Sequence, residues 1–235
     1  MFDNIFEREI ILIGEKKLNI LKNSHVAVFG VGGVGSFVVE ALIRAGIGEL
    51  TIVDFDRIEE SNLNRQLHTN TDNIHLSKVD EMMKRALSIN PHIKINAIHD
   101  EYNFMSHEFI FNEKWDYIVD AIDMVKSKVL LIEKAKENNI LIITSMGTGN
   151  KINPSLFKID DIHKTKMCPL ARIMRKELRK RKITDVKALY STEKPGNFVH
   201  DNRLKGTISF IPSVAGLLIA SEVIRDLIKG ETDAE

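Results

Sequence analysis

A glycine-rich turn directly after a short apolar run is the feature that most constrains the fold of this chain. Residues 26–29 are Val-Ala-Val-Phe, and four glycines follow within six positions: Gly30, Gly32, Gly33 and Gly35. A helical spacing of apolar residues then continues to Ala45. A buried strand that ends in glycines and opens a helix brings the backbone close to a ligand, and the free N–H groups at the helix start favour negative charge. The turn therefore predicts a phosphate-binding α/β domain.

Strand-like and helix-like segments alternate through the first 145 residues. Strands are expected at residues 25–30, 49–54, 94–99, 116–120 and 141–145, and helices at 7–22, 33–45, 77–89 and 125–138. In the first helix, the residues available for a buried side are Ile10, Ile11, Leu12, Leu18 and Leu21. Strands separated by helix-length segments predict a doubly wound, largely parallel Rossmann-like sheet with helices on both faces.

The regular alternation ends after Thr144, where turn-forming residues become frequent. A short strand is expected at residues 157–159, a helix at 169–182, a strand at 207–211, and an apolar packing helix from Pro212 to residue 228 or 229. We therefore expect a nucleotide-binding domain, residues 1–150, and a smaller C-terminal α+β extension, residues 151–235, that packs on it.

Composition excludes several classes of protein. The chain has one cysteine, Cys168, which rules out an intrachain disulfide and a zinc site built of cysteines. It contains no apolar run long enough for a transmembrane helix and begins without the features of a signal peptide, so we expect no membrane association and a cytoplasmic location. The formal net charge is zero, yet residues 164–187 hold ten Lys or Arg and two acids. That local excess predicts a polyanionic partner.

Polar residues after the second predicted strand favour a triphosphate over a dinucleotide. Asp54 lies about 20 residues after the glycines, where a dinucleotide-binding protein holds a ribose. Asn62 and Arg65 share one face of a helical turn, and Lys78 begins the next helix. Arg and Lys side chains that converge on one site neutralise charge at a phosphorus under attack. From the residues alone, ordinary surface cations at positions 65 and 78 stay an open alternative.

The order of these motifs resembles the E1-like adenylating enzymes, the family of ubiquitin activators and of bacterial activators of sulphur-carrier proteins. The family pattern is Gly-x-Gly-Gly-x-Gly, Asp-x-Asp, Ser-Asn-Leu-x-Arg-Gln, a lysine and Asp-x-x-Asp. In this chain the pattern occupies residues 30–35, 54–56, 61–66, 78 and 120–123. Each motif is weak alone, but their order and spacing agree across residues 8–147.

The resemblance implies an ATP site built from these motifs. The nucleotide-binding residues would be the four glycines Gly30, Gly32, Gly33 and Gly35, the acids Asp54 and Asp56, and the triphosphate contacts Asn62, Arg65 and Lys78. Asp54 would hold the ribose of ATP. Arg65 and Lys78 would also be catalytic, because they would neutralise charge at the α-phosphate.

Two further catalytic residues come from the resemblance. Asp123 would bind Mg²⁺ or orient its waters, as an oxygen ligand beside substrate phosphates. Arg8 matches an arginine that a partner subunit inserts, so the resemblance implies a homodimer in which Arg8 reaches the partner's ATP site. Taken as residues alone, Asp123 fits a helix cap equally well, and Arg8 fits a surface charge.

The C-terminal third resembles the branch of this family that acts on transfer RNA, the threonylcarbamoyladenosine dehydratases. The matching segments are residues 162–179, 190–195 and 206–216. The resemblance implies an ATP-dependent cyclisation of the threonylcarbamoyl group of threonylcarbamoyladenosine in tRNA, by adenylation of its carboxylate. It leaves open whether a sulphur-relay protein also binds.

The predicted helix 169–182 combines an apolar stripe with a basic face. The stripe consists of Leu170, Ile173, Met174 and Leu178. The candidate tRNA-binding residues are Lys166, just before the helix, and Arg172, Arg175, Lys176, Arg179 and Lys182. A row of cations neutralises a phosphate backbone without reading base sequence. A solvated helix face gives the same pattern and stays an alternative.

Three other functions stay open at this stage. An activator of a ubiquitin-like or sulphur-carrier protein would use the same ATP site on the C-terminus of its carrier. A nicotinamide dehydrogenase would leave Asn62, Arg65 and Lys78 without a task, and a tRNA-binding module without catalysis would release no AMP. Cys168 is expected to be a structural thiol, because the resembling dehydratases need no cysteine at this position.

Overall fold

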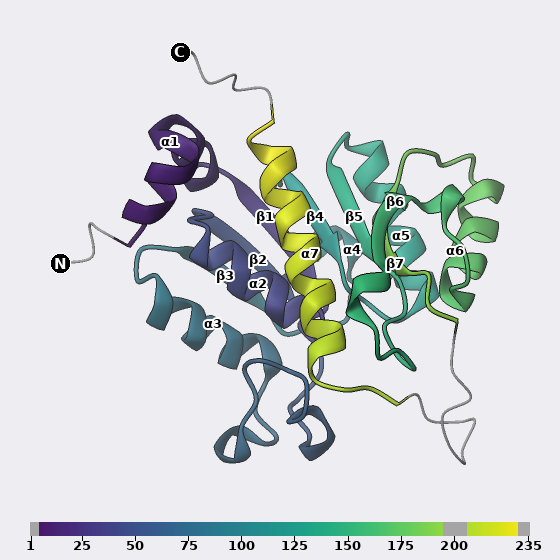
Figure 1. The fold of residues 1–235 in the computed structure, drawn as a ribbon, viewed down its shortest axis with the longest axis horizontal. Coiled ribbons are helices and arrows are strands. Elements are labelled where there is room, and N and C mark those ends of the chain that lie inside the picture. The colour runs from purple at the N-terminus through teal and green to yellow at the C-terminus, as the bar shows by residue number, and fades with distance from the viewer. Residues whose placement is uncertain (1–4, 195–205, 230–235) are drawn as a thin grey trace.

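A seven-stranded sheet runs through the molecule in the order β3-β2-β1-β4-β5-β7-β6 (Figure 1). The computed structural model describes residues 5–194 and 206–229. The strands are β1 (His25–Phe29), β2 (Glu49–Val53), β3 (Lys94–Ile98), β4 (Tyr117–Asp120), β5 (Leu141–Ser145), β6 (Phe157–Asp161) and β7 (Lys187–Ser191). All neighbouring pairs run parallel except β6 and β7, which are antiparallel. The largely parallel sheet expected from the sequence is confirmed.

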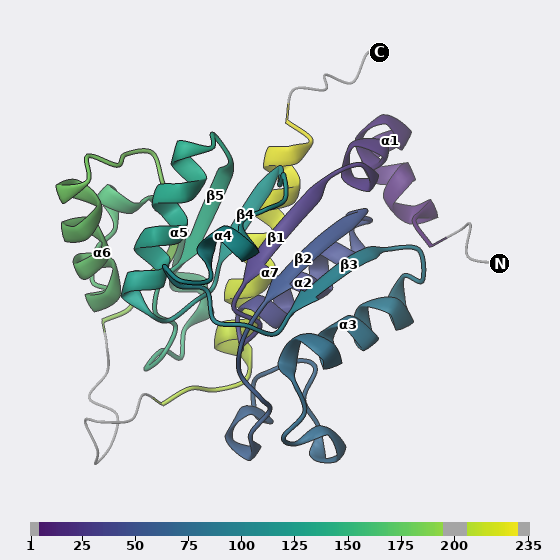
Figure 2. The ribbon, with the colours of Figure 1, turned by 180° about the vertical axis from the view of Figure 1, so that it is seen from behind.

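Helices cover both faces of this sheet, as Figures 1 and 2 show. They are α1 (Glu7–Lys22), α2 (Gly35–Arg44), α3 (Lys78–Ile89), α4 (His107–Ile110), α5 (Val125–Glu137), α6 (Pro169–Lys180) and α7 (Phe210–Leu227). Side chains of α2, α3 and α7 share one apolar core with the sheet, and those of α5 and α6 share a second. Strands β1, β2, β4 and β5 are therefore buried from both sides along most of their length, which is why they are largely apolar rather than alternating. The two edge strands, β3 and β6, are more exposed and carry polar residues. No described helix has the length and apolar character needed to cross a membrane.

The C-terminal third differs from expectation in two elements. The strand expected at residues 207–211 is wrong, because 206–208 have no regular structure and α7 begins at Phe210. Ile211 and Pro212 instead lie buried in the first turn of α7, where proline has a suitable φ angle. Strand β7 was not expected. It lies between β5 and β6, and it pairs antiparallel with β6, which is the edge strand.

Helix α1 is broken at Gly14, which has φ 80° and ψ 159°. In the half after the break, Leu18 and Leu21 are buried against the sheet. In the half before it, Ile11 is 80% exposed and Leu12 is 84% exposed. The expectation that Ile11 and Leu12 face the core is therefore wrong in this chain, because the break turns the first half of the helix away.

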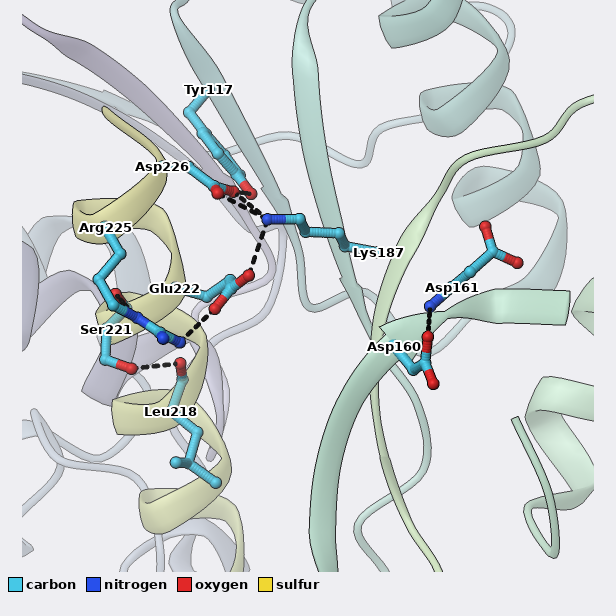
Figure 3. Close-up of polar contacts among 9 residues, drawn as sticks. All are labelled: Tyr117, Asp160, Asp161, Lys187, Leu218, Ser221, Glu222, Arg225 and Asp226. Atoms are coloured by element: carbon cyan, nitrogen blue, oxygen red, sulfur yellow. Dashed lines mark hydrogen bonds and ion pairs between the residues drawn. The ribbon is translucent and has the colours of Figure 1, made fainter. Parts of the chain in front are cut away.

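Helix α7 is held in place by contacts with α2 and with the sheet. Its Gly216 lies so close to α2 that an added Cβ would be 2.4 Å from Val34 O. Near its C-terminal end, Asp226 accepts hydrogen bonds from Lys187 Nζ at 2.6 Å and from Tyr117 OH at 2.8 Å (Figure 3). Glu222 also accepts from Lys187, at 2.7 Å. These contacts fix α7 along the sheet, so that its first turn reaches the carboxyl ends of the strands.

Candidate nucleotide-binding site

A cavity of about 370 Å³ opens at the carboxyl ends of β1, β2 and β4. Its walls include Gly30 after β1, Asp54 after β2 and Ala121 after β4. Strand order reverses here, because the chain moves outward from β1 to β3 and then returns to β4 on the other side of β1. Open α/β sheets bind ligands at such a switch point. The fold therefore places the glycine turn where a nucleotide site is expected.

The glycines of the turn have two different roles. Gly30 has φ +88°, and a Cβ there would lie 2.7 Å from Ala121 O; a Cβ at Gly35 would lie 1.8 Å from Gly30 O. These two positions need glycine for backbone packing. Gly32 and Gly33 line the cavity, as Gly30 also does, and a Cβ at Gly32 would meet only Gln66 Nε2, at 3.9 Å. Gly35 thus shapes the turn without lining the cavity.

Asp54 ties the glycine turn to the end of β2. Its carboxylate accepts a hydrogen bond from Val31 N at 2.6 Å and another from Asp56 N at 2.9 Å. Burial raises the pKa of Asp54, and the nearby Lys78 ammonium opposes that shift. The side chain lines the cavity and keeps the turn in place before any ligand binds.

Cationic and amide side chains converge on one wall of the cavity. Asn62, Arg65 and Lys78 all line it, as expected from the sequence. Lys78 Nζ lies 2.5 Å from Asp56 Oδ2, and the Lys78 side chain is only 6% exposed. Arg65 donates to Ser61 O at 2.5 Å and to Asn64 Oδ1 at 3.0 Å. Two cations thus reach the cavity beside the glycine turn, which suits an anionic ligand.

The two aspartates of the Asp-x-x-Asp motif lie in different environments. Asp123 is exposed, lines the cavity and makes no hydrogen bond or ion pair within the described residues. Asp120 is fully buried, accepts a hydrogen bond from Thr144 Oγ1 at 2.6 Å and pairs with Lys128 at 3.0 Å. A hard cation bound by phosphate oxygens and a carboxylate therefore fits Asp123, while Asp120 is already occupied.

Arg8 does not line this cavity within the described part of the chain. It is exposed on the half of α1 that precedes Gly14. Because α1 leads into the start of β1, it lies beside the amino end of that strand, opposite the cavity (Figure 1). A single chain therefore does not bring Arg8 to the site.

Helix α6 presents most of its cations to solvent. Five of the six candidates are exposed: Lys166, Arg172, Lys176, Arg179 and Lys182. Arg175 differs, because it is half-buried and donates to Thr165 O at 2.9 Å and to Thr165 Oγ1 at 2.6 Å. Within the expected apolar stripe, Met174 and Leu178 are buried and Leu170 is partly buried, but Ile173 is 48% exposed and Ala171 is buried in addition. Cys168 is buried at the start of the helix.

Several cavity residues were not assigned a role from the sequence. They are Gln66, Asp100, Glu101, Tyr102, Thr148, Thr207 and Pro212. Gln66 stood within the recognised motif, and Thr148 within the glycine-rich stretch after β5, so the sequence held a signal for both. Thr207 and Pro212 lie in the segment 206–216 that matched the tRNA-modifying branch, but the segment after β3 carries no such signal. Both segments reach the cavity only because the chain folds back to it.

Nearly the whole chain matches the model of the ThiF family, over residues 6–234. It is 38% identical over 240 residues to the tRNA threonylcarbamoyladenosine dehydratase of Bacillus subtilis (strain 168), covering 95% of this chain and 94% of that protein. With the enzyme of that name from Escherichia coli (strain K12), identity is 37% over 72% of this chain and 63% of the relative. The chain belongs to the ThiF family, so the E1-like resemblance is confirmed.

Solved structures agree with this assignment. The crystal structure of E. coli tRNA N6-threonylcarbamoyladenosine dehydratase, TcdA, in complex with ATP superposes with a TM-score of 0.89 at 30% identity, covering 96% of this chain and 94% of that one. The complex of the same enzyme with AMP gives a TM-score of 0.90 at 31% identity, with the same coverage. The described fold is therefore that of the tRNA-modifying branch of the family.

Proposed function

We propose that this protein is an ATP-dependent tRNA threonylcarbamoyladenosine dehydratase that acts in the cytoplasm. The observation that carries the proposal is the one cavity that Arg65, Lys78, the glycine turn and an unoccupied carboxylate, Asp123, all line. Relatives that share almost the full length of the chain bear the same enzyme name, and one is solved with ATP and with AMP. Residues 1–150 would supply most of the ATP site, joined by Thr207 and Pro212, and residues 151–235 would supply the surface that binds tRNA.

In the first step, the carboxylate of the threonylcarbamoyl group attacks the α-phosphate of ATP. The bond between that phosphorus and the bridging oxygen breaks, pyrophosphate leaves, and an acyl-adenylate forms. Lys78 and Arg65 stabilise the negative charge that develops on the phosphate oxygens, because they are aimed at the cavity before the reaction begins. Asp54 and Asp56 hold the ribose end of the nucleotide, and Asn62 contacts the triphosphate.

In the second step, an atom of the neighbouring carbamoyl group closes on the activated carbonyl. AMP leaves with the carboxylate oxygen, a proton is released, and the RNA has lost one water. The step is intramolecular, so the protein needs to orient the group rather than supply a nucleophile. This agrees with Cys168, the one cysteine, being buried away at the start of α6.

Mg²⁺ is the proposed cofactor beside ATP. Bound to the phosphates, it would neutralise charge on the leaving pyrophosphate. Asp123 is the carboxylate that would hold it, because this side chain faces the cavity without a partner among the described residues. Asp54 and Asp120 already accept hydrogen bonds from the protein.

A homodimer would complete the site. Arg8 is exposed on the projecting half of α1, next to Ile11 and Leu12, which are 80% and 84% exposed. Neighbouring apolar side chains left in water favour burial against another chain. A second copy that buries them would insert its Arg8 at the α-phosphate. Binding of a sulphur-relay protein stays a prediction.

The exposed cations of α6, with Lys166 and Lys182, are the proposed tRNA-binding face. Their side chains stand on the side of the helix away from Ala171, Met174 and Leu178, which are buried. Such a face binds the phosphate backbone of a nucleic acid whatever its base sequence. Arg175 would contribute less to RNA binding, because its guanidinium is held by Thr165.

The decisive experiment incubates the protein with ATP, Mg²⁺ and tRNA that carries threonylcarbamoyladenosine, followed by mass spectrometry of the nucleosides. The expected product is lighter by one water, with one AMP released for each product. Arg65→Ala and Asp123→Ala should abolish turnover and leave folding and RNA binding unchanged. An activator of a carrier protein would instead exchange ATP with pyrophosphate only when a ubiquitin-like protein is supplied, and that result would refute the proposal.

A further inference from the structure

Lys128 is a buried cation below the cavity, and the proposed reaction assigns it no role. Its side chain is fully buried in the first turns of α5. The ammonium group has three acceptors: Asp120 Oδ2 at 3.0 Å, Ile122 O at 3.0 Å and Ser145 O at 2.9 Å. An ammonium group has three N–H donors, so each one is used.

The position is unfavourable for a cation by itself. Burial removes the hydration of the charge, and the N-terminal end of a helix carries partial positive charge, which repels it. Asp120 compensates for both effects, and Thr144 Oγ1 donates to Asp120 Oδ2 at 2.6 Å. A buried ion pair is weak evidence for a gain in folding stability, because well-packed apolar residues in the same place often give a protein that is equally stable. The arrangement therefore requires an explanation other than general stability.

The acceptors of Lys128 belong to the two chain segments that form adjacent walls of the cavity. Ile122 lies in the turn between β4 and α5, whose residues 121–124 line the cavity and include Asp123. Ser145 ends β5 and leads to Thr148, which also lines it. Asp120 itself accepts a hydrogen bond from Ile122 N at 3.2 Å. One ammonium group thus joins the turn that carries Asp123 to the segment that carries Thr148.

We propose that Lys128 is a positioning residue for adenylation. Its buried side chain does not line the cavity and so would not touch a bound ligand. Lys128 instead holds residues 121–124 and 145–148 in register with the glycine turn. The glycine turn packs closely against residues 121–124, since a Cβ at Gly30 would lie 2.7 Å from Ala121 O. The inference rests on the proposed function and adds to it the residue that sets the geometry of Asp123.

The test uses a double variant, Asp120→Asn with Lys128→Met, because the single Lys128 change would leave a buried carboxylate unpaired. The double variant keeps side chains of similar size and buries no charge, but Ile122 O and Ser145 O lose a donor, so thermal unfolding should occur at a moderately lower temperature with the protein folded at the assay temperature. Misplacement of Asp123 should lower kcat for AMP release about 100-fold. The KM for ATP and the affinity for tRNA should change by less than about threefold, because Lys78, Arg65 and α6 are untouched.

Two comparisons separate positioning from general stability. Lys134→Met, on the same helix, removes a surface cation that pairs with Glu137 and should leave every value unchanged. Lys128→Arg keeps a cation and N–H donors in place and should recover kcat about tenfold over the double variant. A double variant with unchanged kcat, or a folded Lys128→Arg no more active than the double variant, would overturn the proposal. Failure of the unmodified protein to release AMP would instead reject the proposed function.

Discussion

Lys78 and Asp56 form an ion pair in the wall of the nucleotide cavity, with 2.5 Å between Nζ and Oδ2. Lys78 is buried and Asp56 is half-exposed, so the ammonium group is kept at the cavity surface rather than released to solvent. A buried lysine with one carboxylate partner is prepared to exchange that partner for a phosphate oxygen. Under the proposed function, the pair would hold this cation in place before ATP arrives.

Replacement of this lysine gives the first prediction. Lys78→Met should lower kcat/KM for ATP by about 100- to 1,000-fold, because it removes a preorganised charge at the α-phosphate. AMP release with modified tRNA is the measurement. Lys84→Met is the matched control on the same helix, since Lys84 pairs with Glu81 on the surface. Equal losses in both variants would show that Lys78 has no special role in the reaction.

The basic face of α6 gives the second prediction. Arg172→Ala with Lys176→Ala should reduce the slope of log affinity against log salt by about 0.7–0.9 for each phosphate that the variant no longer neutralises. Filter binding of tRNA at several salt concentrations measures it. Lys84→Ala with Lys94→Ala removes the same charge elsewhere and should leave the slope unchanged. A slope equal to that of the control pair would contradict a tRNA-binding role for α6.

Arg175 on the same helix serves as an internal contrast. It donates two hydrogen bonds to Thr165, so Arg175→Ala should cost about 1–3 kcal/mol in the free energy of unfolding. Its effect on the salt slope should be smaller than that of Arg172. Urea unfolding and the same binding assay distinguish the two residues.

The break at Gly14 gives the third prediction. A φ of 80° with ψ of 159° is a conformation that only glycine adopts readily, so Gly14→Ala costs about 1–3 kcal/mol if the break persists. There is open space around the position, so the substituted helix is free to straighten instead. Straightening would redirect Arg8, Ile11 and Leu12 away from a partner subunit.

We therefore expect Gly14→Ala to weaken dimerisation in sedimentation experiments and to lower AMP release. Glu15→Ala, at the next position, is the control and should do neither. A Gly14→Ala protein that stays dimeric and fully active would argue against the role of the projecting half of α1.

His68 gives the fourth prediction, which concerns pH. Burial, with the nearby Lys78 charge as a second cause, lowers the pKa of His68 to about 4. Neither ring nitrogen has a hydrogen-bond partner within the described residues. In the unfolded chain the pKa returns to about 6.5, so the unfolded state binds a proton that the folded state does not as pH falls from 6.5 to 4. The histidine therefore lowers the free energy of unfolding in that window, by up to about 1.4 kcal/mol per pH unit.

The variant His68→Leu removes this titration and an unpartnered polar group. Its stability should equal or exceed that of the unmodified protein at pH 7, and the advantage should grow as pH falls towards 4. Urea unfolding at pH 7, 5.5 and 4.5 measures the difference. An advantage that is independent of pH would show that His68 is not a buried neutral histidine.

The sequence by itself determined the largely parallel sheet and which motif residues share one cavity. The glycine turn, Asp54 and Asp123 follow the carboxyl ends of strands, and Lys78 begins α3; Asn62 and Arg65 lie in the segment that joins β2 to α3. Because parallel strands end at one edge, residues at those ends are brought together whatever the details of packing. Local spacing was therefore enough to predict the cavity.

Tertiary structure alone decided which side chains are free and which are engaged. The basic pattern of α6 does not distinguish Arg175, held by Thr165, from exposed Arg172. Nor does helical periodicity reveal that Gly14 turns Ile11 into solvent, or that Lys128 joins two walls of the site. These outcomes depend on partners far away in the chain, and periodicity records which face a residue occupies but not what that face meets.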